Sequence, residues 1–271
     1  MSEPLPQKKL PRAEVSVSAI VWRWPDKPPC AEAAAVIDRA IAAARWVFFP
    51  SSLDLATLAA AGQMLAGRDV AMIVGIDADD LLARRSKPLE DRLAALRRES
   101  CEAVMLQRVE ITELKAGRPF HRLAQLRDAG RTQLAMLEAP DVADAEWMVE
   151  STPAHAISLP FDLSDQLAKY RVLPAAREMG TAILSRRAAP ARWPLDPPAS
   201  AAENIAFRAG EEDVAAVIEP LAEDVKTLEL LLAAVRSPMP PAEREQWWTR
   251  FQAHVPPPAK RPRGHPPEYG T

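Results

Sequence analysis

The sequence predicts a single (β/α)8 TIM barrel of the α/β class. Eight short apolar runs alternate with Ala- and Leu-rich runs whose apolar residues recur at helical spacing. The short apolar runs are continuous rather than alternating, which indicates parallel strands that are buried on both faces. The chain has 271 residues, close to the ~250 that are typical of one such barrel. An open, doubly wound sheet is the alternative, and the short connections and the count of eight favour the barrel.

The eight strand–helix units follow one another along the chain. The expected strands are residues 15–22, 46–49, 70–74, 103–106, 133–137, 156–159, 181–184 and 214–218. The expected helices are residues 31–44, 54–66, 88–99, 120–129, 142–150, 165–179, 201–209 and 224–235. Asp54 is expected to cap the second helix, because an aspartate there can accept a hydrogen bond from the first helical turn. Pro50 stops the strand before it.

Two terminal segments are expected to flank the barrel, which we assign to residues 15–255. Residues 1–14 hold prolines and charges without an apolar core, which predicts a flexible N-terminus. An extra helix is expected at 240–252, where Trp247, Trp248 and Phe251 offer a large apolar area. Residues 256–271 are rich in proline and basic side chains, which predicts a disordered or polyproline-like tail.

The composition excludes several classes of partner. A net charge of −3 argues against general nucleic-acid binding, which normally needs a basic excess. The sequence has no apolar run of ~18 residues, so we expect no membrane-spanning helix. The two cysteines, Cys30 and Cys101, lie far apart, which argues against a disulfide framework and predicts a cytoplasmic protein. The glycines form neither of the common phosphate-binding loop patterns.

Several stretches of the sequence resemble the aldo/keto reductase family. The resemblance covers about residues 16–235 and is carried by residues 33–49, 103–107, 126–131, 156–166, 173–180, Val217 and Ile218, together with Glu229. It is most specific between residues 153 and 187. The resemblance implies a (β/α)8 barrel and a site with an Asp, Tyr, Lys and His tetrad. In that family the Tyr donates a proton to a carbonyl that receives hydride from NADPH.

The chain departs from the family at all four tetrad positions. These positions read Pro50 for the Asp, Asp54 or Leu55 for the Tyr, Val74 or Gly75 for the Lys, and Arg108 or Val109 for the His. Acid catalysis by a phenol requires the phenol beside the substrate and a nearby cation that lowers its pKa. The sequence therefore predicts a divergent member that lacks the tetrad, and we assign no catalytic residue.

The positions that resemble the family's cofactor contacts are changed as well. The Ser-Asn pair that holds the nicotinamide matches Leu137 and Glu138, the strand-six Gln matches Ser158, and the stacking aromatic matches Ser185. The phosphate-binding loop matches residues 218–224, which include Glu219, Glu223 and Asp224. Three carboxylates there would repel a 2′-phosphate. We therefore expect no cofactor and assign no cofactor-binding residue; NADP is the cofactor if the chain is nonetheless an active reductase.

The candidate site residues are those at the carboxyl ends of the strands, where barrel enzymes place their reactive groups. These barrel-mouth residues are Asp54, Asp77, Arg108, Glu138, Arg186, Arg187 and Glu219. The arginines either form a cationic patch for an anionic ligand or pair with neighbouring acids. The acids at 77, 79 and 80 have the spacing of metal ligands, but helix capping explains them better, and we expect no metal site.

Three functions are compatible with these observations. The first is a pseudoenzyme, a barrel that has lost NADPH-dependent carbonyl reduction and acts as a binding or assembly protein, with another protein as its partner. The second is an NAD(P)-dependent oxidoreductase of the aldo/keto reductase family whose catalytic residues are displaced. The third is a different reaction on the same barrel that uses Asp54, Asp77 and Glu138 as acid and base. The sequence predicts no substrate and no oligomeric state.

Overall fold

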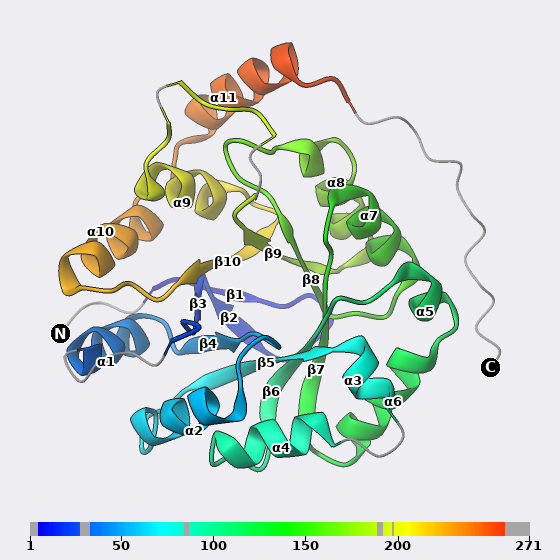
Figure 1. Ribbon diagram of the computed structural model, residues 1–271. Helices are drawn as coiled ribbons and strands as arrows, with labels where there is room; N and C mark the ends of the chain where they lie inside the picture. Colours follow the sequence, from blue (N-terminus) through cyan, green and yellow to red (C-terminus); the bar gives the residue numbers. More distant parts are fainter. Residues whose placement is uncertain (1–4, 28–32, 84–86, 189–191, 197, 258–271) are drawn as a thin grey trace.

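Eight parallel strands close into a barrel in the computed structural model, which describes residues 5–27, 33–83, 87–188, 192–196 and 198–257 (Figure 1). Around the barrel the strands follow the order β10, β3, β4, β5, β6, β7, β8 and β9. They are β3 (Ile20–Arg23), β4 (Trp46–Phe49), β5 (Ala71–Asp77), β6 (Cys101–Gln107), β7 (Thr132–Glu138), β8 (Ala156–Pro160), β9 (Ala182–Arg186) and β10 (Val214–Pro220). This order confirms the predicted (β/α)8 barrel.

The helices form a layer around the outside of the barrel (Figure 1). They are α1 (Ala34–Ala43), α2 (Leu55–Met64), α3 (Ala78–Leu82), α4 (Pro88–Ala95), α5 (Ile111–Lys115), α6 (Arg118–Asp128), α7 (Val142–Ser151), α8 (Val172–Met179), α9 (Ala201–Gly210), α10 (Val225–Arg236) and α11 (Pro241–His254). The expected helix at 165–179 is interrupted, because a 3-10 turn (Leu167–Tyr170) precedes α8. Among the described residues, no helix combines the length and apolar character needed to cross a membrane.

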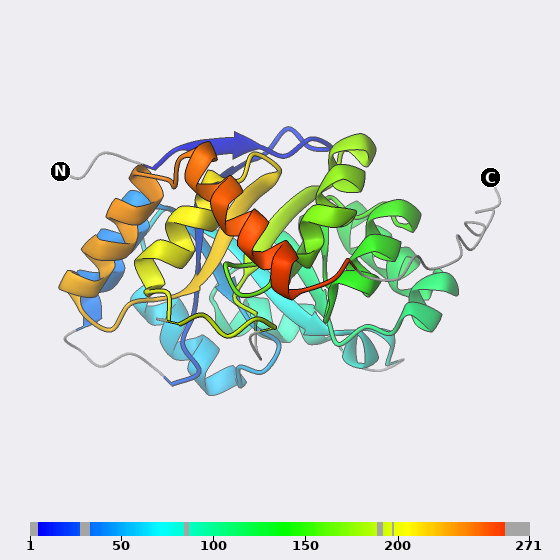
Figure 2. The ribbon, with the colours of Figure 1, turned by 90° about the horizontal axis from the view of Figure 1, so that it is seen from above.

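The N-terminal segment differs from the expected flexible arm. Strands β1 (Gln7–Lys9) and β2 (Ser16–Ser18) pair antiparallel, and the hairpin lies across one end of the barrel (Figure 2). Leu10 and Val17 are fully buried and pack into the same cluster as barrel residues such as Val21. The ammonium group of Lys8 donates a hydrogen bond to the carbonyl of Val214 at 2.6 Å. The hairpin of residues 7–18 therefore closes this end of the barrel, and the hydrophobic burial of Leu10 and Val17 holds it there.

The structure confirms the predicted extra helix and describes little of the predicted tail. The predicted helix at 240–252 is confirmed as α11, in which Phe251 is fully buried while Trp247 and Trp248 are partly buried. The tail expected at 256–271 lies almost entirely outside the described residues, which end at Pro257. The short helices α3 and α5, which follow β5 and β6 directly, were not predicted because they are only five residues long.

The strands have two different faces, and this decides which side chains reach the mouth of the barrel. Along β5, Ala71 and Ile73 pack with the interior of the barrel, while Met72 and Val74 pack with the surrounding helices. Side chains of successive strand residues point to opposite faces. Inward positions at the carboxyl ends therefore include Gly75, Asp77, Gln107, Glu138 and Arg186, whereas Arg187 and Glu219 point outward toward the helices.

Acid is expected to destabilise the fold through His155, which lies near the start of β8. The His155 ring is buried, and its Nδ1 accepts a hydrogen bond from the Ala135 amide at 3.2 Å. Burial is the main cause that lowers the pKa of His155 below the ordinary 6.5, and the positive charge of Arg127 lowers it further. Below 6.5 the unfolded chain binds a proton that the folded chain does not, so stability falls as the pH drops and is fully present above that value. Urea unfolding at about pH 7.5 and about pH 5.5 measures this loss. His155→Gln should show a smaller loss; equal losses in both proteins would contradict the assignment.

Candidate functional site

A chain of hydrogen bonds and one ion pair crosses the mouth of the barrel. The Ser51 amide donates to Oε1 of Gln107 at 2.6 Å, and the side-chain amide of Gln107 donates to Glu138. Glu138 lies 3.8 Å from Nε of Arg186, whose Nη2 donates to the carbonyl of Ala139 at 2.8 Å. Burial lowers the pKa of Arg186, and the charge of Glu138 opposes that shift. The inward polar groups of β6, β7 and β9 are thus bonded to one another and to the loops.

Gln107 occupies the space beside Gly75, one of the two positions that match the family's lysine. A Cβ atom at residue 75 would lie 2.3 Å from Oε1 of Gln107 and 2.7 Å from the Ser51 amide nitrogen. Both distances are shorter than any normal contact, so only glycine fits here without displacing Gln107 and the loop backbone. The glycine and the glutamine together fill this part of the mouth.

Arg92 fixes the loop that follows β4, where Pro50 stands at the position of the family's aspartate. Arg92 is 8 % exposed, and its guanidinium group donates to the carbonyls of Pro50, Ser51 and Leu53, the last at 2.9 Å. Burial lowers the pKa of Arg92, and the charges of Asp77 and Asp80 oppose that shift. The loop is held by a side chain that reaches it from α4.

Asp77 and Arg108 form an ion pair at the ends of the neighbouring strands β5 and β6. Their closest atoms are 3.1 Å apart, and the Arg108 side chain is 70 % exposed. Exposed pairs of this kind contribute little to stability. Arg108 has a φ of 51°, a left-handed conformation that an arginine adopts only at some cost. Among the described residues, no group of three or more His, Cys, Asp or Glu side chains is arranged to hold a metal ion.

Glu219 and Arg187 are outside the mouth, contrary to the expectation from the sequence. Glu219 is 1 % exposed and pairs with Arg208 of α9, which is completely buried; Arg187 is its second partner, with Nε 3.3 Å from the carboxylate. Burial lowers the pKa of Arg208 to about 9. The carboxylate lies between β10 and the helix layer, because residue 219 occupies an outward position of the strand.

Asp54 and Asp224 cap helices, so their carboxylates are already engaged. Asp54 accepts a hydrogen bond from the Thr57 amide at 2.7 Å, which confirms the predicted cap of α2. Asp224 accepts from the Thr227 amide at 2.8 Å at the start of α10. These backbone hydrogen bonds lower the pKa of each carboxyl group, so both caps stay ionised at neutral pH.

The seven residues predicted for the mouth therefore do not form one site. Glu138 and Arg186 come together in the mouth, Asp77 and Arg108 pair at its rim, Arg187 and Glu219 pair outside it, and Asp54 caps α2. Sequence reasoning missed Gln107, Arg92 and Arg208. The two arginines carried a detectable signal, because each occupies an apolar position of an amphipathic helix, as Arg92 does beside Leu89 and Leu93.

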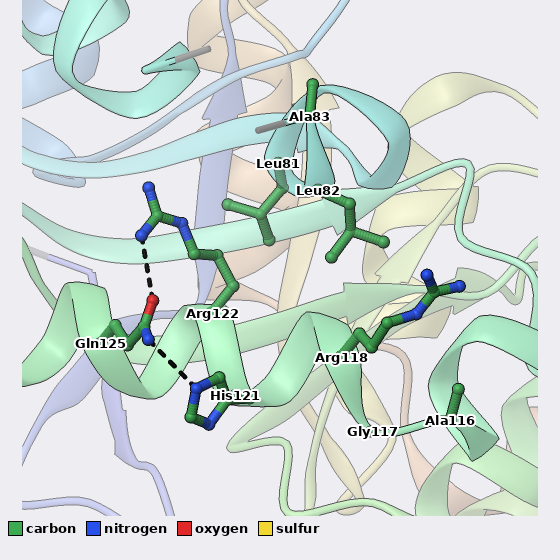
Figure 3. A pocket seen from close by; sticks show the side chains of 9 residues that line it. All are labelled: Leu81, Leu82, Ala83, Ala116, Gly117, Arg118, His121, Arg122 and Gln125. Atoms are coloured by element: carbon green, nitrogen blue, oxygen red, sulfur yellow. Dashed lines mark hydrogen bonds between the residues drawn. The ribbon is translucent and has the colours of Figure 1, made fainter. Parts of the chain in front are cut away.

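Four cavities that are lined by described residues have no predicted mouth residue in their lining. One of about 540 Å³ lies between α3 and α6 (Figure 3). Its apolar side is Leu81 and Leu82, and its polar side is on α6, where Gln125 hydrogen-bonds both Arg122 and His121. A second, of about 300 Å³, lies between α11 and the loop after β9.

Comparison with solved structures shows which known proteins share this fold. No protein-family model matches the sequence, and no curated protein matches it. Among solved structures, an aldo-keto reductase from Klebsiella pneumoniae in complex with NADPH superposes with a TM-score of 0.71 at 15% identity, over 91% of this chain and 94% of that one. The apo form of an aldo-keto reductase from Bacillus halodurans gives 0.73 at 13% identity, over 90% and 95%.

A thermostable aldo-keto reductase in complex with the inhibitor epalrestat gives a TM-score of 0.72 at 14% identity, over 90% of this chain and 99% of that one. At these identities the similarity establishes the architecture, and the high coverage of both chains shows that the whole barrel is shared. The chain therefore has the fold of the aldo-keto reductases.

Proposed function

We propose that this protein is a cytoplasmic pseudoenzyme of aldo-keto reductase fold, which does not reduce carbonyl compounds with NADPH and serves as a binding or assembly partner of another protein. The observation that carries the proposal is the set of side chains on the barrel strands and at the mouth. The eight strands contain no Tyr, Lys or His, and Ser51, Gln107, Glu138 and Arg186 are linked across the mouth by two hydrogen bonds and an ion pair. None of these four residues is a tyrosine, lysine or histidine that could serve as the acid of a carbonyl reduction.

Tyr170, the tyrosine that the structure describes, does not supply a phenol at the mouth of the barrel. The sequence has two tyrosines, Tyr170 and Tyr269. Tyr170 packs against Trp248 of α11, with ring centroids 4.7 Å apart, on the outer side of the helix layer. Tyr269 lies outside the described residues. Among the described residues, a reductase mechanism with tyrosine as the acid therefore has no candidate at the mouth.

The residues present do not fit NADP. The N-terminus of α10 follows the loop that resembles the family's phosphate-binding loop, and it already holds the carboxylate of Asp224. Glu223 precedes that cap and is exposed. A helix N-terminus attracts one anion, and a bound carboxylate repels a second. Glu219 does not contribute to this repulsion, because it is buried against Arg208.

Two alternatives remain as competing proposals. One aldo-keto reductase from Klebsiella pneumoniae is a complex with NADPH and another is a complex with NADP and acetate. These complexes support NADP as the cofactor if the chain is an oxidoreductase with displaced catalytic residues. The acid–base reaction with Asp54, Asp77 and Glu138 has less support, since these three carboxylates have separate partners and separate positions.

We expect no NADPH oxidation above background when the purified protein is incubated with 4-nitrobenzaldehyde, a broad carbonyl substrate. The loss of the acid alone removes about 10²–10⁴ in rate. Absorbance of NADPH measures the reaction, and heat-treated protein is the control. Steady oxidation that heating abolishes and desalting does not would contradict the proposal and favour the displaced-residue oxidoreductase.

A further inference from the structure

An aromatic groove lies on the outside of the barrel, beside the C-terminal helix. Helix α11 packs on α9 at the edge of the helix layer, next to the loop that follows β9 (Figure 1). The groove between them has a volume of about 300 Å³. Its aromatic residues are Trp193 from the loop and Trp247 from α11, and both are only partly buried. It is separate from the mouth and from every group discussed for catalysis.

The aromatic rings of the groove are held in a fixed arrangement. The ring of Trp193 stacks on His254 at 4.9 Å and lies 6.4 Å from the ring of Trp247 at a steep angle. The guanidinium group of Arg250 lies over the ring of Trp247, 4.9 Å from its centroid. Proline-rich segments bind grooves that are lined by aromatic rings, because the proline rings pack between the aromatic rings. Such a segment is already extended before it binds, so it loses little conformational entropy.

The rim of the groove carries negative charge. Asp196 and Glu203 both line it. The Glu203 carboxylate accepts a hydrogen bond from the Ser200 amide as part of a capping box, and this bonding lowers its pKa, so it stays ionised. Arg250 is the one cation that lines the groove among the described residues, and it is engaged with the ring of Trp247. A proline-rich segment with basic residues matches this combination.

The chain itself ends in such a segment. Residues 256–271 contain six prolines together with Lys260, Arg261 and Arg263. The described chain leaves α11 at Val255, immediately after His254, whose ring stacks on Trp193 of the groove. We propose that residues 258–271 bind in the groove of their own chain, with prolines against Trp193 and Trp247 and basic side chains beside Asp196 and Glu203.

The length of the tail suits this path. From His254 back to Trp247 along α11 is about 10 Å, at ~1.5 Å per helical residue. Six residues of extended polyproline chain span about 19 Å, at ~3.1 Å per residue. Residues 258–263 therefore reach the whole groove after one reversal of direction, and the tail's three cations arrive at its acidic rim. Attachment to α11 keeps the tail at a high local concentration, so a weak site is enough.

Limited trypsin digestion of the full chain tests the proposal, because Lys260 and Arg263 are cleavage sites within the tail. We expect cleavage there to be about tenfold slower than in a synthetic peptide of residues 256–271, since a site of ~100 μM affinity is ~90 % occupied at a tethered concentration of ~1 mM. Trp247→Ala and Asp196→Lys should each raise the rate toward that of the peptide. Trp147→Ala removes a half-buried tryptophan of α7 and should leave the protection intact.

Three results would overturn the proposal. Cleavage in the unmodified chain as fast as in the peptide would show that the tail is not bound. Protection that survives both groove substitutions would place the tail elsewhere; Asp196 is exposed, so its replacement tests the groove without disturbing packing. Protection that appears only at high protein concentration would mean that the groove binds the tail of a second copy rather than its own.

Discussion

Replacing Arg208 by methionine is expected to lower the free energy of unfolding by about 3–5 kcal/mol. The substitution leaves the Glu219 carboxylate 1 % exposed between β10 and α9, with the half-exposed Arg187 as its remaining partner. An uncompensated buried charge is far more costly than the loss of a surface ion pair. Urea unfolding followed by tryptophan fluorescence measures the change.

Two further variants test the reason for this loss. The double variant Arg208→Met with Glu219→Leu removes both charges and should recover much of the lost stability, because apolar residues of similar size often replace a buried pair without cost. Arg177→Met breaks the exposed pair with Asp213 and should change stability little. If Arg208→Met were as mild as Arg177→Met, the carboxylate of Glu219 would not be buried as described.

The second large effect is expected at Arg92. Replacing it by methionine leaves the carbonyls of Ser51 and Leu53 without their side-chain donor, while the Pro50 carbonyl keeps the hydrogen bond from the Leu53 amide at 3.2 Å. An unpaired buried acceptor costs about 1–3 kcal/mol, so the two together should lower the free energy of unfolding by about 2 kcal/mol or more. Hydrogen exchange at residues 51–53 should quicken as well, because the loop loses its anchor.

Arg97→Met is the matched control for Arg92. Arg97 follows the same helix, is exposed, and receives the same substitution. We expect unchanged stability and unchanged exchange in the loop after β4. Equal effects of the two substitutions would show that the loop does not depend on Arg92.

The barrel itself could be predicted from the sequence because its strands are continuous apolar runs. Residues 46–49 and 156–159, for example, have no alternation that would permit an exposed face, and both are inner strands of the closed sheet. The hairpin that closes the barrel could not be predicted in this way. Its strands have three residues each, and its two fully buried apolar residues are Leu10 and Val17.

The mouth was harder to predict because a strand end does not reveal the direction of its side chains. Glu219 ends an apolar run as Glu138 does, but it lies on the outward face of its strand and pairs with a helix. The apolar run predicts a strand that ends at Val74, before Gly75, whereas β5 continues to Asp77. That glycine is needed because Gln107 crosses above it, a contact between strands that no local pattern contains.

Glu223 and Asp224, rather than the buried Glu219, are the carboxylates placed to repel the phosphate of NADP. Glu223→Arg combined with Asp224→Ser reverses one charge and removes the other while a serine still caps α10. If carboxylates at this helix start exclude the phosphate, the double variant should bind NADPH more tightly than the unmodified chain. Unchanged affinity would mean that other features exclude the cofactor.

Calorimetric titration of the unmodified, full chain with NADPH tests the pseudoenzyme proposal most directly, because carbonyl reduction in the aldo-keto reductase family requires this cofactor. The carboxylate at the start of α10 and the hydrogen-bonded mouth predict a dissociation constant no better than about 1 mM, or about 4 kcal/mol of binding free energy. A dissociation constant of about 1 μM, near 8 kcal/mol, would contradict the pseudoenzyme proposal and would make an NADP-dependent oxidoreductase the better assignment.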